Sequence, residues 1–250
     1  MSYYHPSSGP RGTMSKGTQN KFCYVVYRME RLGMARCMIL DLDGTLVDSV
    51  PDLELSLNRL MAVRGLAGFD YPAVAAMVGD GAAVLIERAF AAHGRTPDAA
   101  ALDDFLADYG AHTAEASVAY PGVEATLRQL HADGWKLAVC TNKPEAPARS
   151  LLAALGLDGL FAAIGGADSY PMRKPDPGHL LATLASAGGT VDRAIMIGDH
   201  KNDVAAALGA GVPCIFAAWG YGPPAMAAGA VAVAEDFPQA AHLAAGLLRG

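Results

Sequence analysis

The sequence predicts an α/β protein with a doubly wound, mostly parallel β-sheet and an all-helical segment inserted after the first strand. Short apolar runs recur along the chain, and stretches with apolar residues at helical spacing separate them. Apolar runs without alternation are typical of parallel strands that are buried on both faces. The chain has 250 residues, of which 52% are hydrophobic, and this suffices for one large domain or a core with a smaller insertion.

The strands of the predicted sheet are six apolar runs that are too short to be helices. They span residues 38–40, 137–140, 162–164, 194–197, 214–217 and 231–234. Helical spacing predicts the helices of the core at residues 121–133, 145–155, 176–187, 202–208 and 239–248. Gly134 and Gly156 directly follow the first two of these helices, and glycine commonly ends a helix.

The segment after the first strand has a different pattern, since residues 52–120 show no alternation typical of a strand. Helical spacing predicts helices at residues 52–63, 72–78, 82–93 and 99–116. Pro51 and Pro121 stand at the two borders, which suits linkers. Because an insertion at this point lies above the carboxyl ends of the strands, we expect a helical cap (52–120) that acts as a lid over a core (34–51 and 121–250).

Residues 1–33 differ from the rest of the chain. Residues 1–20 are polar and have neither a helical nor a strand period, so we expect them to be disordered. The segment lacks the apolar core of a secretion signal. We expect Met34 to be the natural start, with the preceding residues an extension that activity does not need.

Composition excludes several kinds of partner. The net charge is -6 and Lys and Arg form no run, which argues against nucleic acid and against an anionic membrane surface. No apolar segment reaches the roughly 18 residues of a membrane span. The four cysteines, Cys23, Cys37, Cys140 and Cys214, lack the spacing of a metal or redox site. Reduced, buried thiols predict a cytoplasmic protein, and the sequence leaves open whether it is a monomer or a homodimer.

Two carboxylates follow the first predicted strand, in the stretch Asp41-Leu42-Asp43-Gly44-Thr45-Leu46. Because strand side chains alternate between faces, we expect Asp41 and Asp43 on the same side. Two carboxylates there repel each other and lose hydration unless a cation or a proton lies between them. A carboxylate can attack phosphorus and a second one can handle the proton, so we interpret the pair as catalytic rather than as two turn residues.

Other core strands also end in polar groups. Thr141 and Asn142 follow the second strand, and Lys174 lies in a proline-rich segment further on. Asp199 follows the fourth strand, with Asp203 four residues later. The carboxyl ends of parallel strands meet at one edge of the sheet, so we expect these groups to converge. Carboxylates, hydrogen-bond donors and a cation suit a phosphoryl group together with Mg²⁺, which prefers oxygen ligands.

These four stretches resemble, in order and spacing, the four motifs of the haloacid dehalogenase superfamily of phosphohydrolases. The resemblance extends from about residue 37 to about residue 225 and implies a Rossmann-like core with a helical cap. Further stretches resemble the phosphoglycolate phosphatase subfamily, namely Val78-Gly79-Asp80-Gly81-Ala82 with Glu87-Arg88-Ala89, Cys140-Thr141-Asn142-Lys143-Pro144, and Trp219-Gly220-Tyr221-Gly222. The resemblance thus implies a Mg²⁺-dependent phosphomonoesterase that hydrolyses 2-phosphoglycolate through an aspartyl-phosphate.

The resemblance also implies a role for each matching residue. Asp41 would attack phosphorus, and Asp43 would protonate the leaving alkoxide and then activate water. Thr141 and Asn142 would donate hydrogen bonds to phosphate oxygens. Lys174 would neutralise the charge of the nucleophile and of the phosphate, and would therefore serve both catalysis and substrate binding.

The implied metal site and cap loop complete this assignment. Asp199 would hold Mg²⁺ together with the carboxylate of Asp41 and the backbone carbonyl of Asp43. Asp203 would bind the metal or orient its surroundings in a supporting role. Gly81 lies in the cap loop that would be lowered over a small phosphorylated metabolite.

Other functions keep part of this chemistry. A phosphatase for a sugar phosphate, for N-acetylmuramate 6-phosphate or for pyrophosphate would differ in its cap residues, and the sequence does not choose among these substrates. A sugar phosphomutase would return the phosphoryl group to its product, but Thr45 after Gly44 resembles the phosphatases more. A phospho-receiver switch protein also uses Asp, Thr and Lys, yet it needs neither a lid nor a leaving-group acid such as Asp43.

Overall fold

The computed structural model describes residues 35–248. The expected disorder of residues 1–33, the proposed start at Met34 and the thiol of Cys23 lie outside this range. Within it, no helix combines the length and the hydropathy that crossing a membrane requires.

The described core contains a six-stranded sheet in the order β5-β4-β1-β6-β7-β8, and every neighbouring pair is parallel. Its strands are β1 (Cys37–Leu40), β4 (Lys136–Cys140), β5 (Ala163–Gly165), β6 (Ala194–Gly198), β7 (Cys214–Ala217) and β8 (Ala232–Ala234). The predicted α/β fold with a doubly wound parallel sheet is confirmed, and each strand border lies within one residue of its predicted position. Because β1 lies between β4 and β6, the chain changes direction across the sheet at β1, where such folds bind ligands.

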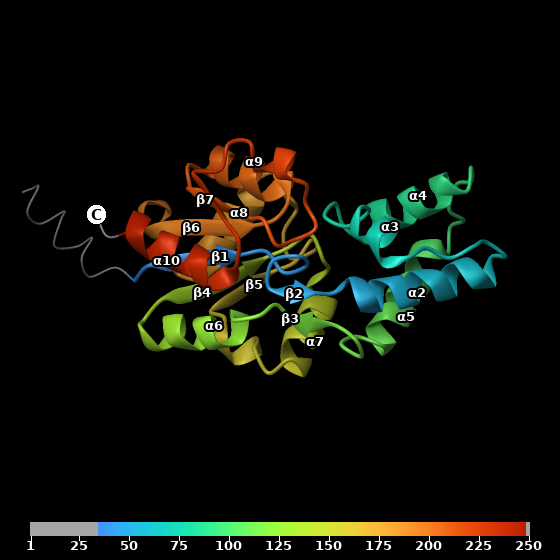
Figure 1. The fold of residues 1–250 in the computed structure, drawn as a ribbon, viewed down its shortest axis with the longest axis horizontal. Helices are drawn as coiled ribbons and strands as arrows, with labels where there is room; N and C mark the ends of the chain where they lie inside the picture. Colours follow the sequence, from blue (N-terminus) through green and yellow to red (C-terminus); the bar gives the residue numbers. More distant parts are fainter. Residues whose placement is uncertain (1–34, 249–250) are drawn as a thin grey trace, which may run out of the picture. The chain divides into compact units, whose positions relative to one another are not determined.

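The first strand shows why an unbroken apolar run was needed. All four residues of β1 are fully buried, and successive side chains enter different clusters on opposite faces of the sheet. Met38 and Leu40 pack with residues of α6 (Val123–Ala132), α7 (Glu145–Ala154) and α10 (Phe237–Leu247). Cys37 and Ile39 pack with residues of α8 (Pro177–Ser186) and α9 (Lys201–Ala210). Figure 1 shows α8 and α9 on one side of the sheet and α6 and α7 on the other.

The predicted core helices are present, and their borders differ from the predicted ones by at most two residues. Asp176 precedes α8 and its side chain accepts a hydrogen bond from the backbone of Gly178, so it is a helix cap rather than part of the helix. The described part of the core also contains three short 3₁₀ helices, at Asp158–Leu160, Val191–Arg193 and Pro224–Ala227.

The insertion contains α2 (Val50–Val63), α3 (Tyr71–Ala75), α4 (Ala82–Ala92) and α5 (Ala101–Ala111), which form one group in Figure 1. They bury an apolar cluster of their own, including Leu57, Phe90 and Phe105. The helix predicted at residues 99–116 is shorter than expected. The helix ends at Ala111, one residue after Gly110. Beyond it, the hydroxyl of Thr113 donates to the carbonyl of Tyr109 and Ala114 adopts a φ of +66°, so the helix does not continue.

The expectation of no strand within residues 52–120 is wrong. β3 (Val118–Ala119) pairs antiparallel with β2 (Val47–Asp48), so the two linkers of the insertion run side by side. Two residues are too few to show alternation, and the pairing joins segments that are distant in sequence. Buried Asp52 fixes the same junction, because its carboxylate accepts hydrogen bonds from the backbone amides of Ala116 and Ser117. The borders of the cap at residues 52 and 120 stay a prediction.

Candidate active site

The predicted site residues from the core strands lie at one edge of the sheet. Asp41 directly follows β1, Thr141 follows β4 and Asp199 follows β6, and these three strands are neighbours. The backbone N–H of Asp41 donates to the carbonyl of Ile197 at 3.0 Å, so strand pairing continues into the site. The sheet therefore fixes the positions of all three residues.

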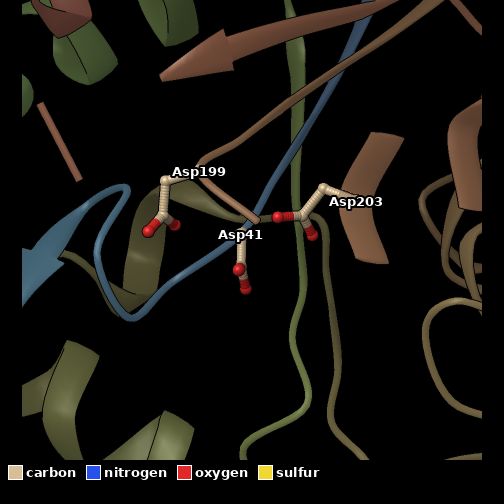
Figure 2. Close-up of side chains that lie close together, drawn as sticks. All are labelled: Asp41, Asp199 and Asp203. Carbon is tan, nitrogen blue, oxygen red and sulfur yellow. The ribbon is translucent and has the colours of Figure 1, made fainter. Parts of the chain in front are cut away.

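Three carboxylates, those of Asp41, Asp199 and Asp203, converge at this edge. Each offers an oxygen within 4.8 Å of the others, and all three residues are buried. Figure 2 shows them coming from three segments, with Asp41 between the other two in that view. A cluster of this kind needs cations or protons to compensate its charge.

Lys174 supplies one positive charge to this cluster. Its Nζ lies 2.8 Å from Oδ1 of Asp41 and 2.6 Å from Oδ1 of Asp203. Burial alone would lower the pKa of Lys174, but the carboxylates of Asp203 and Asp41 outweigh it and raise the pKa above its ordinary value. Lys174 is therefore charged, and it joins the end of β1 to the first turn of α9.

The cluster retains an excess of negative charge, because one lysine faces three carboxylates. Burial, followed by the charge of Asp203, raises the pKa of Asp41 to about 6. Burial, followed by the charges of Asp41 and Asp203, raises the pKa of Asp199 to about 8. These oxygen donors and this uncompensated charge fit a hard divalent cation such as Mg²⁺.

Two donors orient the carboxylate of Asp199. The hydroxyl of Thr45 donates to Oδ1 and the backbone N–H of Tyr221 donates to Oδ2, both at 2.8 Å. The phenol of Tyr221 reaches the first linker of the cap, where it donates to Asp48 and accepts from the backbone N–H of Ser49. The loop after β7 thus connects Asp199 with the cap linker, a connection that the sequence did not reveal.

Asp43 lies in a tight turn after β1 rather than in the strand. Leu42 is buried and its carbonyl accepts backbone hydrogen bonds from Thr45, Leu46 and Val47, which close the turn. Asp41 and Asp43 nevertheless line the same cleft, as expected from their spacing. Because β1 ends at Leu40, Asp41 and Asp43 reach the same cleft through the geometry of the turn and not through the alternation of strand side chains.

Sequence reasoning missed Lys143, which holds Asp43. Its Nζ lies 3.0 Å from Oδ1 and 3.1 Å from Oδ2 of Asp43, and the hydroxyl of Ser49 donates to Oδ1 at 2.6 Å. Burial would lower the pKa of Lys143, but the charge of Asp43 outweighs it and raises the pKa. The position of Lys143, directly after Thr141 and Asn142, was the signal available, but a single lysine is usually solvated.

Thr141 and Asn142 are both buried, and they line the same cleft as Asp41. The hydroxyl oxygen of Thr141 accepts from the backbone N–H of Lys143 at 3.1 Å, which leaves its proton for another acceptor. The side-chain amide of Asn142 donates to the carbonyls of Lys174 and Gly79, at 3.0 and 3.1 Å. Asn142 therefore joins the lysine loop of the core to the cap.

The cap loop 79–81 lies against the core. Gly81 caps α4 with a φ of +93°, and a side chain there would come within 3.1 Å of the carbonyl of Asn142. Asn202 of α9 donates to Asp80 at 2.7 Å, and a side chain at Gly79 would collide with the ring of His200. Glycine suits both positions, because both have a left-handed φ and a Cβ would come close to His200 or to the carbonyl of Asn142.

A cleft opens between the cap and the core at this loop. Its core side carries Asp41, Asp43, Thr141, Asn142 and Lys143. Its cap side is mostly apolar, with Leu53, Val78, Ala82, Leu85, Phe105, Leu106 and Tyr109. The carboxylates thus face a cleft whose opposite wall is mostly apolar.

Known proteins are similar to this chain. Residues 35–211 match the family of haloacid dehalogenase-like hydrolases. A phosphoglycolate phosphatase of Rhodospirillum rubrum is 46% identical over 213 residues, which cover 82% of this chain and 88% of the relative. One of Caulobacter vibrioides is 45% identical over 185 residues, covering 72% and 78%. The solved structure of a predicted phosphoglycolate phosphatase from Haemophilus somnus has a TM-score of 0.76 at 31% identity, covering 84% of this chain and 97% of that one.

Proposed function

Because the chain belongs to the haloacid dehalogenase-like hydrolases and is a phosphatase of the phosphoglycolate phosphatase type, we propose that it hydrolyses 2-phosphoglycolate to glycolate and phosphate through an aspartyl-phosphate. One observation carries the mechanism: Asp41 lies between a charged lysine and Asp199, with Asp43 on the same cleft. A nucleophile, a charge-neutralising group and a proton carrier are the parts that this chemistry requires.

In the first step an oxygen of the Asp41 carboxylate attacks phosphorus. The bond between phosphorus and the ester oxygen breaks, and Asp43 gives its proton to the leaving alkoxide, which departs as an alcohol. In the second step Asp43 takes a proton from water, whose oxygen attacks phosphorus. Phosphate leaves, and the carboxylate of Asp41 is regenerated.

Other residues stabilise charge and position the phosphoryl group. Lys174 neutralises Asp41 and the incoming phosphate, since its charged Nζ is already 2.8 Å from the nucleophile. The hydroxyl oxygen of Thr141 accepts a hydrogen bond from the backbone N–H of Lys143, and its proton is donated to a phosphate oxygen. The side-chain amide of Asn142 gives its two hydrogens to the carbonyls of Lys174 and Gly79, which joins the core to the cap loop. Its contribution to phosphate binding would therefore have to come from its backbone N–H. Gly81 closes the substrate side of the cleft.

We propose Mg²⁺ as the cofactor, held by the carboxylates of Asp41 and Asp199 and the carbonyl of Asp43. Asp203 supports the site by holding Lys174 and by accepting a hydrogen bond from the backbone N–H of His200. When bound, Mg²⁺ would offset the negative charge of the phosphoryl group and allow a carboxylate to approach it. The excess of carboxylates over lysines in the cluster supports this proposal.

The choice of 2-phosphoglycolate rests on the cap wall and on the names of the relatives. Leu53, Leu85 and Phe105 offer no hydrogen bonds to sugar hydroxyls, which would lose water on entering the cleft. A short acid has no such hydroxyls, and its carboxylate needs only one charged partner in the cleft. The relatives that are 46% and 45% identical bear the name of this activity.

The buried thiols support the proposed cytoplasmic location. Cys37, Cys140 and Cys214 are buried and free. Burial raises the pKa of Cys37 to about 11 and that of Cys140 to about 12, so both are inert thiols. Free thiols persist in a reducing compartment.

Phosphate release with Mg²⁺ tests the function on a panel of 2-phosphoglycolate, glucose 6-phosphate, N-acetylmuramate 6-phosphate and pyrophosphate. We expect kcat/KM to favour 2-phosphoglycolate by about 100-fold or more. Asp41→Asn should lack turnover on every ester, which excludes a contaminating phosphatase. Equal kcat/KM values across the panel would refute 2-phosphoglycolate as the preferred substrate but would leave the proposed reaction mechanism in place. Phosphate release in step with ester consumption excludes a mutase, and a wild-type aspartyl-phosphate stable for minutes would point to a receiver protein.

A further inference from the structure

We propose that Lys143 and Tyr109 form the site that recognises a carboxylate on the substrate, at the end that is not transferred. This inference rests on the proposed function and names the residues that choose its substrate. It assigns the phosphatase to short phosphate esters of 2-hydroxy acids, in which the carboxylate is one carbon from the ester oxygen.

Lys143 has the position and the donors for this contact. Its ammonium group lines the cleft with a side chain that is only 5% exposed. An ammonium has three N–H donors, and the two oxygens of Asp43 account for two of the hydrogen bonds around it. Among the described residues that line this cleft, Lys143 alone carries a positive charge.

Tyr109 of α5 supplies the cap side of the same site. Its ring centroid lies 4.5 Å from Nζ of Lys143, within range of a cation–π interaction. Its hydroxyl is buried and makes no hydrogen bond of regular geometry among the described residues, although it lies close enough to the ammonium of Lys143 for the two groups to interact. Tyr109 also lines the cleft. A buried hydroxyl without a regular hydrogen bond is unfavourable, and a carboxylate oxygen of a ligand would satisfy it.

The distance between the ester oxygen and the carboxylate of the substrate agrees with this arrangement. Asp43 must contact the ester oxygen in order to protonate it, and Lys143 lies 3.0 Å from Asp43. In a 2-hydroxy acid, two bonds of about 1.5 Å each separate the ester oxygen from the carboxyl carbon. A carboxylate at that distance reaches Lys143 when the ester oxygen is at Asp43.

The contact has a consequence for selectivity. The ammonium of Lys143 is buried at the cleft and has a third donor beyond the two that face the oxygens of Asp43. A substrate carboxylate gives this ammonium a second charged acceptor, whereas an ester without an acid group gives it none. The pair therefore discriminates in kcat/KM between acid and neutral esters of the same size.

The test compares 2-phosphoglycolate with ethyl phosphate, which has the same two carbons and no carboxylate. For Lys143→Gln we expect the ratio of kcat/KM values to fall by about 50-fold or more, with Lys143→Arg restoring most of it. Tyr109→Phe, which keeps the ring, should lower the ratio by about five- to tenfold through a higher KM. Inhibition by glycolate should weaken in parallel.

Lys136→Gln is the matched control, because Lys136 begins β4 at the opposite edge of the sheet and donates to the carbonyl of Gly188. It should keep the wild-type ratio. An equal loss on both esters in Lys143→Gln would reduce Lys143 to a positioning residue for Asp43 and overturn the inference. The inference would also be overturned if Arg173→Gln lost the preference for the acid ester while Lys143→Gln kept it. Arg173 lies near Gly81 of the cap loop, so it is the alternative cation for this role.

The two proposals fail in different ways. A wild-type enzyme that hydrolyses both esters equally well would overturn the carboxylate site and leave the phosphatase mechanism in place. A wild-type enzyme that hydrolyses neither ester would overturn the proposed substrate, and the carboxylate site with it. If Lys143→Gln fails to fold, as circular dichroism would show, the ratio measured for Tyr109→Phe decides.

Discussion

Nζ of Lys174 lies 2.8 Å from Oδ1 of Asp41, and the two side chains are 1% and 10% exposed. The backbone N–H of Leu42 donates to the same oxygen at 2.8 Å. The nucleophile of the proposed reaction is therefore held by two donors before any substrate arrives. Asp43 has its own lysine, Lys143, so each aspartate of the pair faces a separate cation.

Lys174→Met should destabilise the metal-free protein by about 3–5 kcal/mol, because it removes the cation and leaves buried carboxylates unpaired. Urea unfolding of both proteins in EDTA measures this change. Lys136→Met, a substitution of a lysine remote from the site, should change the free energy of unfolding by less than about 1 kcal/mol. Equal stabilities for Lys174→Met and the wild type would contradict the ion-pair account.

Asp43→Asn should lower kcat on ethyl phosphate by about 10²–10⁴-fold, because the leaving alkoxide and the attacking water lose their proton carrier. 4-Nitrophenyl phosphate has a leaving group that needs no proton. With this ester the variant should release a burst of nitrophenol equal to the enzyme concentration and then stall as phosphoenzyme. Near-normal steady-state turnover on ethyl phosphate would remove Asp43 from the acid–base role.

Gly44→Ala should inactivate the enzyme, because the new methyl group would collide with Oδ2 of Asp199 and come within 2.8 Å of the ring of Tyr221. Gly65→Ala is the control for backbone strain. Gly65 has a similar left-handed φ, +67° against +83°, and open space around its Cα. Both variants should lose about 1–2 kcal/mol of stability for the left-handed alanine. Phosphatase activity should disappear only in Gly44→Ala, and a comparable loss in Gly65→Ala would exclude the steric explanation.

The metal-free protein should lose stability as the pH rises from about 6.5 to 8. The folded state raises the pKa of Asp199 from 3.8 to about 8, so Asp199 keeps a proton that the unfolded chain has already released in this range. Burial lowers the pKa values of His179 and His200 from 6.5, and these two groups act in the opposite direction at lower pH. In EDTA, Tm should therefore be about 4 °C lower at pH 8 than at pH 6.5.

Mg²⁺ should reverse this trend, because it compensates the ionised carboxylates and binds the folded state. The gain in Tm on adding Mg²⁺ should be larger at pH 8 than at pH 5. Asp199→Asn should flatten the pH dependence of the EDTA sample and reduce the effect of Mg²⁺. A Tm that is insensitive to Mg²⁺ at pH 8 would argue against the proposed metal site.

The sequence by itself determined the α/β architecture and the edge of the sheet at which the site lies. Unbroken apolar runs such as residues 38–40 are buried on both faces, an environment typical of a parallel sheet between helices. The polar residues that follow these runs then have to meet, because parallel strands end at the same edge. Asp41, Thr141 and Asp199 were predictable for this reason.

The tertiary structure alone decided which charges pair. Lys143 and Asp43 are 100 positions apart, and Tyr109 approaches them from the cap, so no local spacing signals their contact. The strand pairing of Val47 with Ala119 was missed for the same reason. Periodicity reports the burial of one element at a time, whereas these contacts depend on how the cap and the core pack together. The feature that we propose to select the substrate lies at that junction.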